Sequence, residues 1–84
     1  MAVIPGSQIR AARVLLRWSQ IELCRRSGVS RDTLVKIERG EGNPQLATTE
    51  KLVRALEDGG LEMIDRGQIS QARGLGVRLK RLDP

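Results

Sequence analysis

The sequence predicts a mainly α-helical fold of four to five short helices, followed by a short C-terminal two-stranded β-ribbon. Three observations lead to this fold class. Apolar residues recur at helical spacing as far as about residue 58, serines and glycines stand where helices should begin and end, and the last part of the chain alternates with period two. With 84 residues, we expect a single small domain without a separate ligand-binding unit.

The apolar residues favour packed helices over a β-sandwich. They make up 39% of the chain, and Trp18 is the one large aromatic residue among them. Leu, Ile, Val and Ala suit the small contact surfaces between short helices, so we expect an aliphatic core with Trp18 as its anchor. Cys24 is expected to fill a small space in the same core.

Residues 7–17 are predicted to form the first helix. Ile9, Ala12 and Leu16 fall on one face at helical spacing, and the arginines of this stretch fall elsewhere. Ser7 is the expected N-cap, because a serine oxygen can accept a hydrogen bond from a free amide of the first turn.

Two short helices joined by a glycine turn are predicted next. Ser19-Gln20-Ile21-Glu22 has the pattern of a capping box, in which the serine oxygen accepts the N3 amide and the glutamate reaches back to the serine amide. This box opens a helix over about 20–27, which Gly28 can end in the left-handed conformation. Ser30 is a second N-cap, for a helix over about 31–39. The arrangement is that of a helix-turn-helix unit.

A fourth helix over about 46–58 is expected to complete a helix-turn-helix domain at residues 1–60. The residues at helical spacing along it are Leu46, Thr49, Leu52, Val53 and Leu56. Residues 61–84 are expected to extend the same domain as the β-ribbon, with a flexible loop over about 66–75. A ribbon this short must pack on the helices or on a second subunit.

Charge and composition narrow the possible functions. The formal net charge is +5, and most of the 15 cationic side chains are Arg. The guanidinium group of Arg can form bidentate hydrogen bonds with phosphates and with guanine edges. The chain has no His and one Cys, so we expect neither an enzyme, nor a metal site, nor a cofactor. No stretch approaches the roughly 18 apolar residues of a membrane span, and the N-terminus lacks the features of a secretory signal. We therefore expect a cytoplasmic protein.

The segment from residue 18 to residue 44 places caps, a turn glycine and buried positions in one register. Its elements are Trp18-Ser19-Gln20-Ile21-Glu22-Leu23-Cys24, Gly28-Val29-Ser30, Leu34, Ile37-Glu38, Gly40 and Asn43-Pro44. This pattern resembles the lambda-repressor/Cro (XRE) family, and the resemblance extends over roughly residues 8–58. It implies a sequence-specific transcriptional regulator that binds double-stranded DNA as a homodimer on an inverted-repeat operator.

The resemblance also implies which residues contact the partner. They share the outer side of the helix-turn-helix unit and are Gln20, Arg31, Asp32, Thr33, Val35, Lys36 and Arg39. Gln20 takes the position of a phosphate contact at the start of the second helix. The first exposed residues of the recognition helix, 31–33, take the positions that read base edges. Arg13 and Glu38 take the positions of an ion pair that ties the first helix to the recognition helix.

Departures from the family pattern keep a second function open. Val35 is apolar on the face expected to meet DNA, Asp32 is acidic, and Glu41 stands in a loop that is often basic in the family. An apolar residue and two acids suit a protein surface better than a phosphate backbone. The alternative is a helix-turn-helix fold that binds a regulatory protein, as an antiactivator or an antitoxin-like inhibitor.

Overall fold

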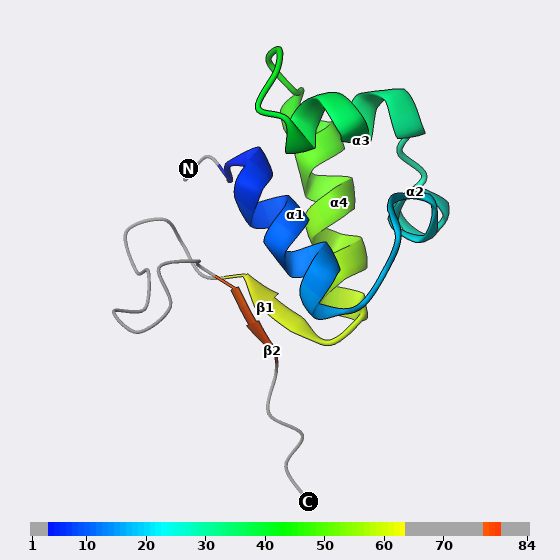
Figure 1. Cartoon of the computed structure of the whole chain (residues 1–84), viewed down its shortest axis with the longest axis vertical. Coiled ribbons are helices and arrows are strands. Elements are labelled where there is room, and N and C mark those ends of the chain that lie inside the picture. The colour runs from blue at the N-terminus through cyan, green and yellow to red at the C-terminus, as the bar shows by residue number, and fades with distance from the viewer. Residues whose placement is uncertain (1–3, 64–76, 80–84) are drawn as a thin grey trace, which may run out of the picture.

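The computed structural model describes residues 4–63 and 77–79, which form four helices and a two-stranded antiparallel sheet (Figure 1). In chain order the elements are α1 Gly6–Leu15, α2 Gln20–Ser27, α3 Arg31–Glu38, α4 Leu46–Asp58, β1 Leu61–Met63 and β2 Val77–Leu79. The predicted class, mainly α with a short β-ribbon, is therefore confirmed, with four helices in the part that the structure describes. The loop predicted over 66–75 lies outside the described residues.

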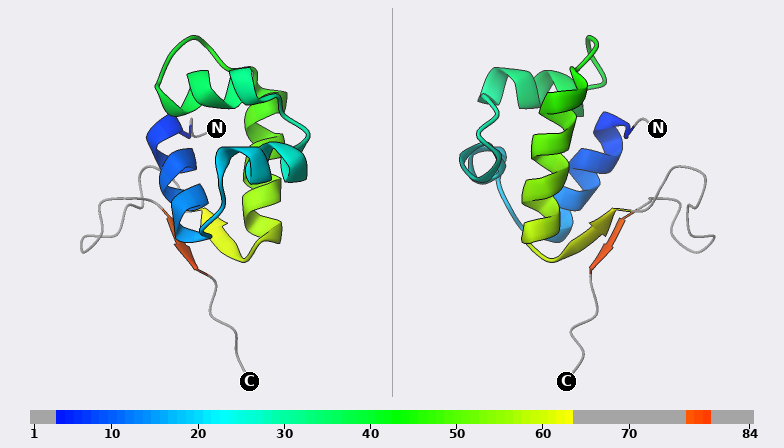
Figure 2. Two further views of the ribbon diagram at one scale, coloured as in Figure 1. Left: turned by 45° about the vertical axis from the view of Figure 1, so that its right-hand side comes forward. Right: turned by 180° about the vertical axis from the view of Figure 1, so that it is seen from behind.

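The helices form two groups. α1 and α4 lie side by side, and α3 lies across one end of this pair (Figure 1 and Figure 2). α2 packs against both α3 and α4. The sheet lies at the opposite end from α3, where β1 contacts α4 and β2 contacts α1, and Leu61 pairs with Leu79 across it. This arrangement leaves α3 at the end of the molecule away from the sheet, with α2 below it beside α4 (Figure 1).

Each helix and the first strand contribute to one aliphatic core. The largest fully buried side chains are Ile9, Leu23, Leu34, Leu52, Leu56 and Leu61. Burying a side chain of this size is worth roughly 1.5–3 kcal/mol relative to leaving it in water. Trp18 is half-buried and packs against the core, and its ring lies so close to Gly59 that a Cβ at Gly59 would collide with it.

The ends of α2 and α3 follow the local chemistry of their caps. The Ser19 hydroxyl oxygen accepts the Glu22 amide at 3.0 Å, and the Ser30 oxygen accepts the Thr33 amide at 3.3 Å. Gly28 ends α2 with a φ of 79°, in the left-handed region that an L side chain resists. Only the second half of the predicted capping box is wrong, because the Glu22 carboxylate binds arginines of its own helix instead of the Ser19 amide.

α1 differs from the prediction at both ends. It begins at Gly6 without a side-chain cap, so the assignment of Ser7 as N-cap is wrong. Packing sets this start, because Gly6 lies so close to the carbonyl of Ile37 that no Cβ would fit between them. At its other end the helix stops at Leu15, two residues earlier than predicted, and Arg17 takes a φ of 60° that turns the chain toward α2.

Two smaller differences concern α3 and α4. α3 ends at Glu38, one residue earlier than predicted, and Arg39 forms its C-cap. Leu46 is 54% exposed, although it falls at helical spacing with the residues of α4 that are buried. It occupies the first position of the helix, and the side chains that face the core come at least a turn later.

Candidate nucleic-acid interface

The helix α3, which the sequence predicts to be the recognition helix, divides its side chains between the core and solvent. Leu34 and Ile37 are buried, three positions apart on the inner side. The outward side chains at the two ends of the helix are polar or charged. Arg31, Asp32, Lys36 and Arg39 are exposed, and Thr33 and Val35 are half-buried. Those expected partner contacts that belong to α3 and its C-cap therefore lie on the outer side of this helix, with Val35 the least polar of them.

The cap at the start of α3 also restrains Thr33. The Ser30 hydroxyl accepts the Thr33 amide and donates to the Thr33 hydroxyl oxygen at 2.9 Å. The serine thus satisfies a free amide of the first turn and holds the threonine side chain at the same time. A fixed side chain at this position loses less conformational freedom when it meets a partner.

Arg13 and Glu38 form the ion pair expected between α1 and α3. The Arg13 Nε donates to Glu38 Oε2 at 2.8 Å, and Nη2 donates to Oε1 at 3.0 Å, so the pair is bidentate. The remaining Arg13 nitrogen, Nη1, donates to the carbonyl of Trp18 at 2.9 Å. The side chains are only 13% and 4% exposed, and a pair this buried is stable only when its remaining donors are satisfied in this way.

Gln20 joins the same carboxylate from α2. Its side-chain Nε2 donates to Glu38 Oε1 at 3.1 Å, and the residue is half-buried. The start of α2 is therefore held against the end of α3, and Glu38 connects three helices. Gln20 is expected on the binding face, but its bond to Glu38 has no local signal in the sequence, because the two residues are 18 positions apart.

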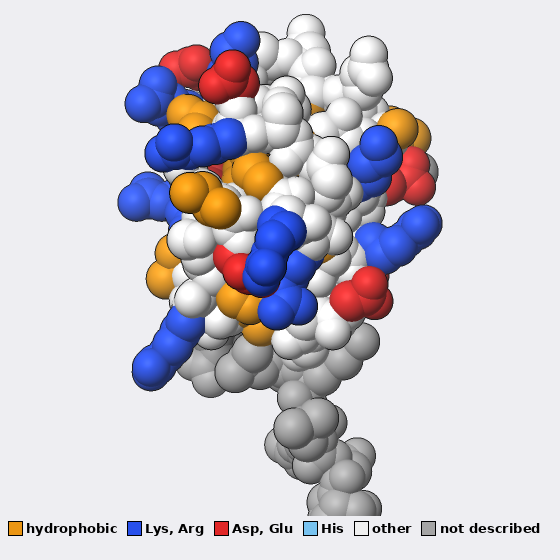
Figure 3. Space-filling view, turned by 90° about the vertical axis from the view of Figure 1, so that its right-hand side faces the viewer, with side chains coloured by type: hydrophobic (Ala, Val, Ile, Leu, Met, Phe, Trp, Pro, Cys, Tyr) orange, Lys and Arg blue, Asp and Glu red, His pale blue; other side chains and the backbone are white. Residues whose placement is uncertain are grey.

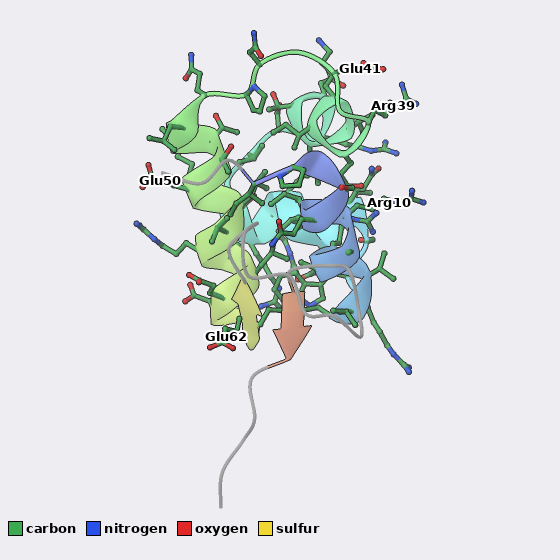
Figure 4. All side chains as sticks on the ribbon, turned by 90° about the vertical axis from the view of Figure 1, so that its left-hand side faces the viewer. Arg10, Arg39, Glu41, Glu50 and Glu62 are labelled. Carbon is green, nitrogen blue, oxygen red and sulfur yellow. The ribbon has the colours of Figure 1, made fainter. Side chains whose placement is uncertain are left out.

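Basic side chains gather on one side of the molecule. Lys and Arg line one edge in Figure 3, which corresponds to the side that faces the viewer in Figure 1. Figure 4 places Arg10 and Arg39 on that same side, with Glu41 beside Arg39 and Glu50 on the opposite side. Arg10 is exposed on α1 and was not among the predicted contacts, although its place off the apolar stripe of that helix is a signal for it. The positive side extends beyond α3 onto α1.

The arginines of α2 are engaged with their own helix. Arg25 and Arg26 contact the Glu22 carboxylate at 2.7 and 2.6 Å, and these hydrogen bonds hold the pKa of Glu22 below its usual value of 4.5. The Arg26 guanidinium also lies 4.3 Å from the centre of the Trp18 ring, within the range of a cation–π contact. These contacts stabilise α2 and its packing on Trp18.

Cys24 has the environment of a packing residue. It is half-buried against the core, and burial raises the pKa of its thiol. A thiol with a raised pKa is a poor nucleophile and a poor metal ligand at neutral pH. Among residues 4–63 and 77–79, no cluster of metal-ligating side chains is found, and no helix is long and apolar enough to cross a membrane.

Comparison with known proteins agrees with this geometry. The model of the Helix-turn-helix family matches residues 9–57, which include α2, the turn at Gly28 and α3. A comparison with curated proteins finds no match. Because the family match covers more than half of the chain, the protein belongs to the lambda-repressor-like (XRE) helix-turn-helix family of DNA-binding regulators.

Proposed function

We propose that this protein is a transcriptional regulator that recognises a specific DNA sequence by placing α3 in the major groove. The observation that carries the proposal is the outer side of α3, where Arg31, Lys36 and Arg39 are exposed on the helix that the family uses for recognition. The basic side of the molecule next to α3 supports it, because non-specific attraction to phosphates precedes recognition of bases.

The residues of this face have different roles in the proposal. Arg31 stands at the first position of α3 and can bind guanine O6 and N7 bidentately, which would discriminate against other bases by roughly 1–3 kcal/mol. Thr33 can contact a thymine methyl, and Asp32 can accept from a cytosine amino group. Lys36 and Arg39 contact phosphates or bases one or two turns further on.

The phosphate contact at the start of α2 belongs to Gln20, and the protein acts as a homodimer. Two recognition helices in successive major grooves would stand about 34–36 Å apart, so the operator would be an inverted repeat. The subunits would join through the β-ribbon or α4, because a short ribbon gains stability from a second packing surface. A cytoplasmic location is part of this proposal.

A second candidate function has an observation in its favour. The half-buried Val35 lies between exposed residues on the outer side of α3, and the acidic side chains Asp32 and Glu41 are exposed near the two ends of that helix. An apolar centre flanked by acids is also the composition of a surface that binds protein. In that case the partner is a regulatory protein, which this chain inhibits as an antiactivator or an antitoxin.

The test is a footprint on the DNA upstream of the protein's own gene at moderate salt. The wild-type protein should protect an inverted repeat, and Arg31→Ala should abolish protection. Lys36→Ala should weaken binding across sequences and lower the salt slope by about one unit. The matched control is Arg54→Ala. Arg54 is exposed on α4 four residues after Glu50, and Glu50 lies on the side opposite Arg10 and Arg39 (Figure 4).

Two outcomes would contradict the proposal of sequence-specific DNA binding. The first is the absence of any footprint at the gene together with a co-purifying protein that Arg31→Ala and Val35→Ala release. The second is an equal loss of binding in Arg31→Ala and Arg54→Ala, which would show attraction by charge alone.

A further inference from the structure

We infer that Glu38 is a positioning residue for the DNA-backbone contact, because its carboxylate holds the side-chain amide of Gln20 at the binding face. The inference rests on the proposed DNA-binding function and adds to it a residue that never touches the DNA. Glu38 thereby acts beyond its ion pair with Arg13, which would stabilise the fold whatever the partner.

The carboxylate itself is fixed from the side of α1. Arg13 occupies Glu38 Oε2 through Nε at 2.8 Å and Oε1 through Nη2 at 3.0 Å, in a planar bidentate arrangement. The Glu38 side chain is 4% exposed, so it has no freedom to follow a mobile partner. Oε1 is therefore a stationary acceptor on the side facing α2.

The amide of Gln20 meets this stationary acceptor with one of its two N–H groups. Nε2 lies 3.1 Å from Glu38 Oε1, and a primary amide nitrogen carries a second hydrogen that points away from the first. Gln20 is the first residue of α2, where a helix N-terminus favours an anion. The second hydrogen is the one that a phosphate oxygen can accept.

Holding the amide before DNA arrives removes an entropic cost from binding. A glutamine side chain has several rotatable bonds, and ordering them on association weakens the affinity. The bond to Glu38 orders them in the free protein. It also ties the phosphate contact on α2 to the end of α3, so that the backbone contact and the recognition helix keep one relative position.

The variant that tests this is Glu38→Gln, because positioning and simple charge predict opposite effects. The substitution removes a negative charge from a DNA-binding protein, which by itself should tighten binding. It also leaves one uncharged amide oxygen where two carboxylate oxygens accepted from Arg13 and Gln20, so the bond that holds the Gln20 side chain should weaken. We expect affinity for a labelled duplex of mixed sequence at low salt to fall about three- to tenfold.

A double-mutant cycle with Gln20→Ala separates positioning from a structural role. In the Gln20→Ala background, Glu38→Gln should no longer weaken binding. Glu22→Gln is the control for charge: it also removes one negative charge next to α2, but Glu22 binds Arg25 and Arg26 and not Gln20, so its effect should be the same in both backgrounds. Affinities are compared at a temperature where the fluorescence of Trp18 shows each variant to be folded.

A measurement on the unaltered protein complements the cycle. In nitrogen-labelled protein, the duplex should shift one side-chain amide proton of Gln20 and leave the proton that faces Glu38 nearly in place. If both side-chain amide protons of Gln20 had the chemical shifts of a free glutamine in the unbound protein, the inference would be overturned. This result would count even if Glu38→Gln did not fold.

The outcomes distinguish this inference from the proposed function. If the wild-type protein does not bind the duplex, the proposed function fails and the inference fails with it. If the wild-type protein binds but Glu38→Gln binds equally well or more tightly, only the positioning role is wrong. An equal loss with and without Gln20 would likewise leave Glu38 a structural residue alone.

Discussion

The two pairs of helices in this protein are defined in different ways. α2 and α3 have eight residues each, and both begin at a serine whose oxygen accepts the amide three residues further on. α1 and α4 have 10 and 13 residues, and neither has a side-chain cap. The starts of the short helices are therefore defined by local side-chain caps, whereas the longer helices begin and end where they pack against their neighbours.

This difference is consistent with the proposed function. A recognition helix must present the same residues to DNA in every molecule, and local caps define its start whatever lies around it. α1 and α4 supply the apolar surface on which α2 and α3 rest, and burial of apolar surface is less sensitive to where a helix begins. The comparison can be tested by changing one end of a helix at a time.

The largest effect is expected at the start of α1. Gly6→Ala places a methyl group against the backbone carbonyl of Ile37, and neither backbone can move without disturbing the core. We expect the free energy of unfolding to fall by about 3 kcal/mol, measured by urea denaturation with Trp18 fluorescence. Helix propensity alone predicts the opposite sign, so a more stable Gly6→Ala variant would show that packing does not set this end.

A smaller loss is expected at the end of α2. Gly28 has a φ of 79°, and a Cβ placed there would meet no atom within 4 Å. Gly28→Ala should therefore cost only the left-handed conformation, about 1–2 kcal/mol, in the same denaturation experiment. Gly28→Asn, which tolerates this conformation better, should recover part of the loss. Equal stability of the alanine and glycine proteins would contradict a conformational origin.

The serine caps should contribute about 1 kcal/mol each. Ser19→Ala and Ser30→Ala each leave an amide of the first turn without its acceptor. Ser7→Ala is the matched control, because Ser7 is exposed in the first turn of α1 and its helix has no side-chain cap. In thermal denaturation followed by circular dichroism, Ser7→Ala should have the same melting temperature as the wild type. A loss in Ser7→Ala as large as in Ser30→Ala would remove the distinction between the two pairs of helices.

The smallest effect concerns acid and the exposed face of α2. Hydrogen bonds from Arg25 and Arg26 lower the pKa of Glu22 below 4.5 in the folded state. A carboxylate whose pKa is lower in the folded state stabilises the fold at pH values above its pKa in the unfolded state. This contribution is lost as the pH falls through the pKa of the folded state. When the pH is lowered below 4.5, the melting temperature of the wild type should therefore decrease more than that of Glu22→Gln.

The effect of acid should be slight, because the Glu22 carboxylate faces solvent. Glu50→Gln, at an exposed position of α4, controls for the loss of one negative charge. Parallel melting curves for the wild type and Glu22→Gln from neutral to acidic pH would show that these ion pairs contribute nothing to the fold.

The parts of the structure that were predicted well depend on neighbours in the chain. The caps at Ser19 and Ser30 and the turn at Gly28 each involve residues within four positions, so their chemistry is visible in the sequence. The ion pair of Arg13 with Glu38 joins residues 25 positions apart, and its expectation came from the family resemblance rather than from local pattern.

The parts that were predicted wrongly or missed depend on contacts between helices. The start of α1 follows from the approach of Gly6 to Ile37, and the orientation of Gln20 follows from a bond to Glu38. Neither contact has a local signal, because the partners come together only when α1, α2 and α3 are packed. The exposure of Leu46 has the same origin, since an apolar residue at a helix end is buried only if another element covers it.

The sequence by itself determined that two short capped helices follow one another across a glycine turn, because caps and a left-handed turn involve only neighbouring atoms. It also determined the apolar stripes that bury Leu34 and Ile37 and leave Arg31 and Lys36 outside. Only the tertiary structure decided where α1 begins and that Glu38 serves both Arg13 and Gln20. The physical reason is that a buried carboxylate can join three helices only at the distances that the packed core imposes.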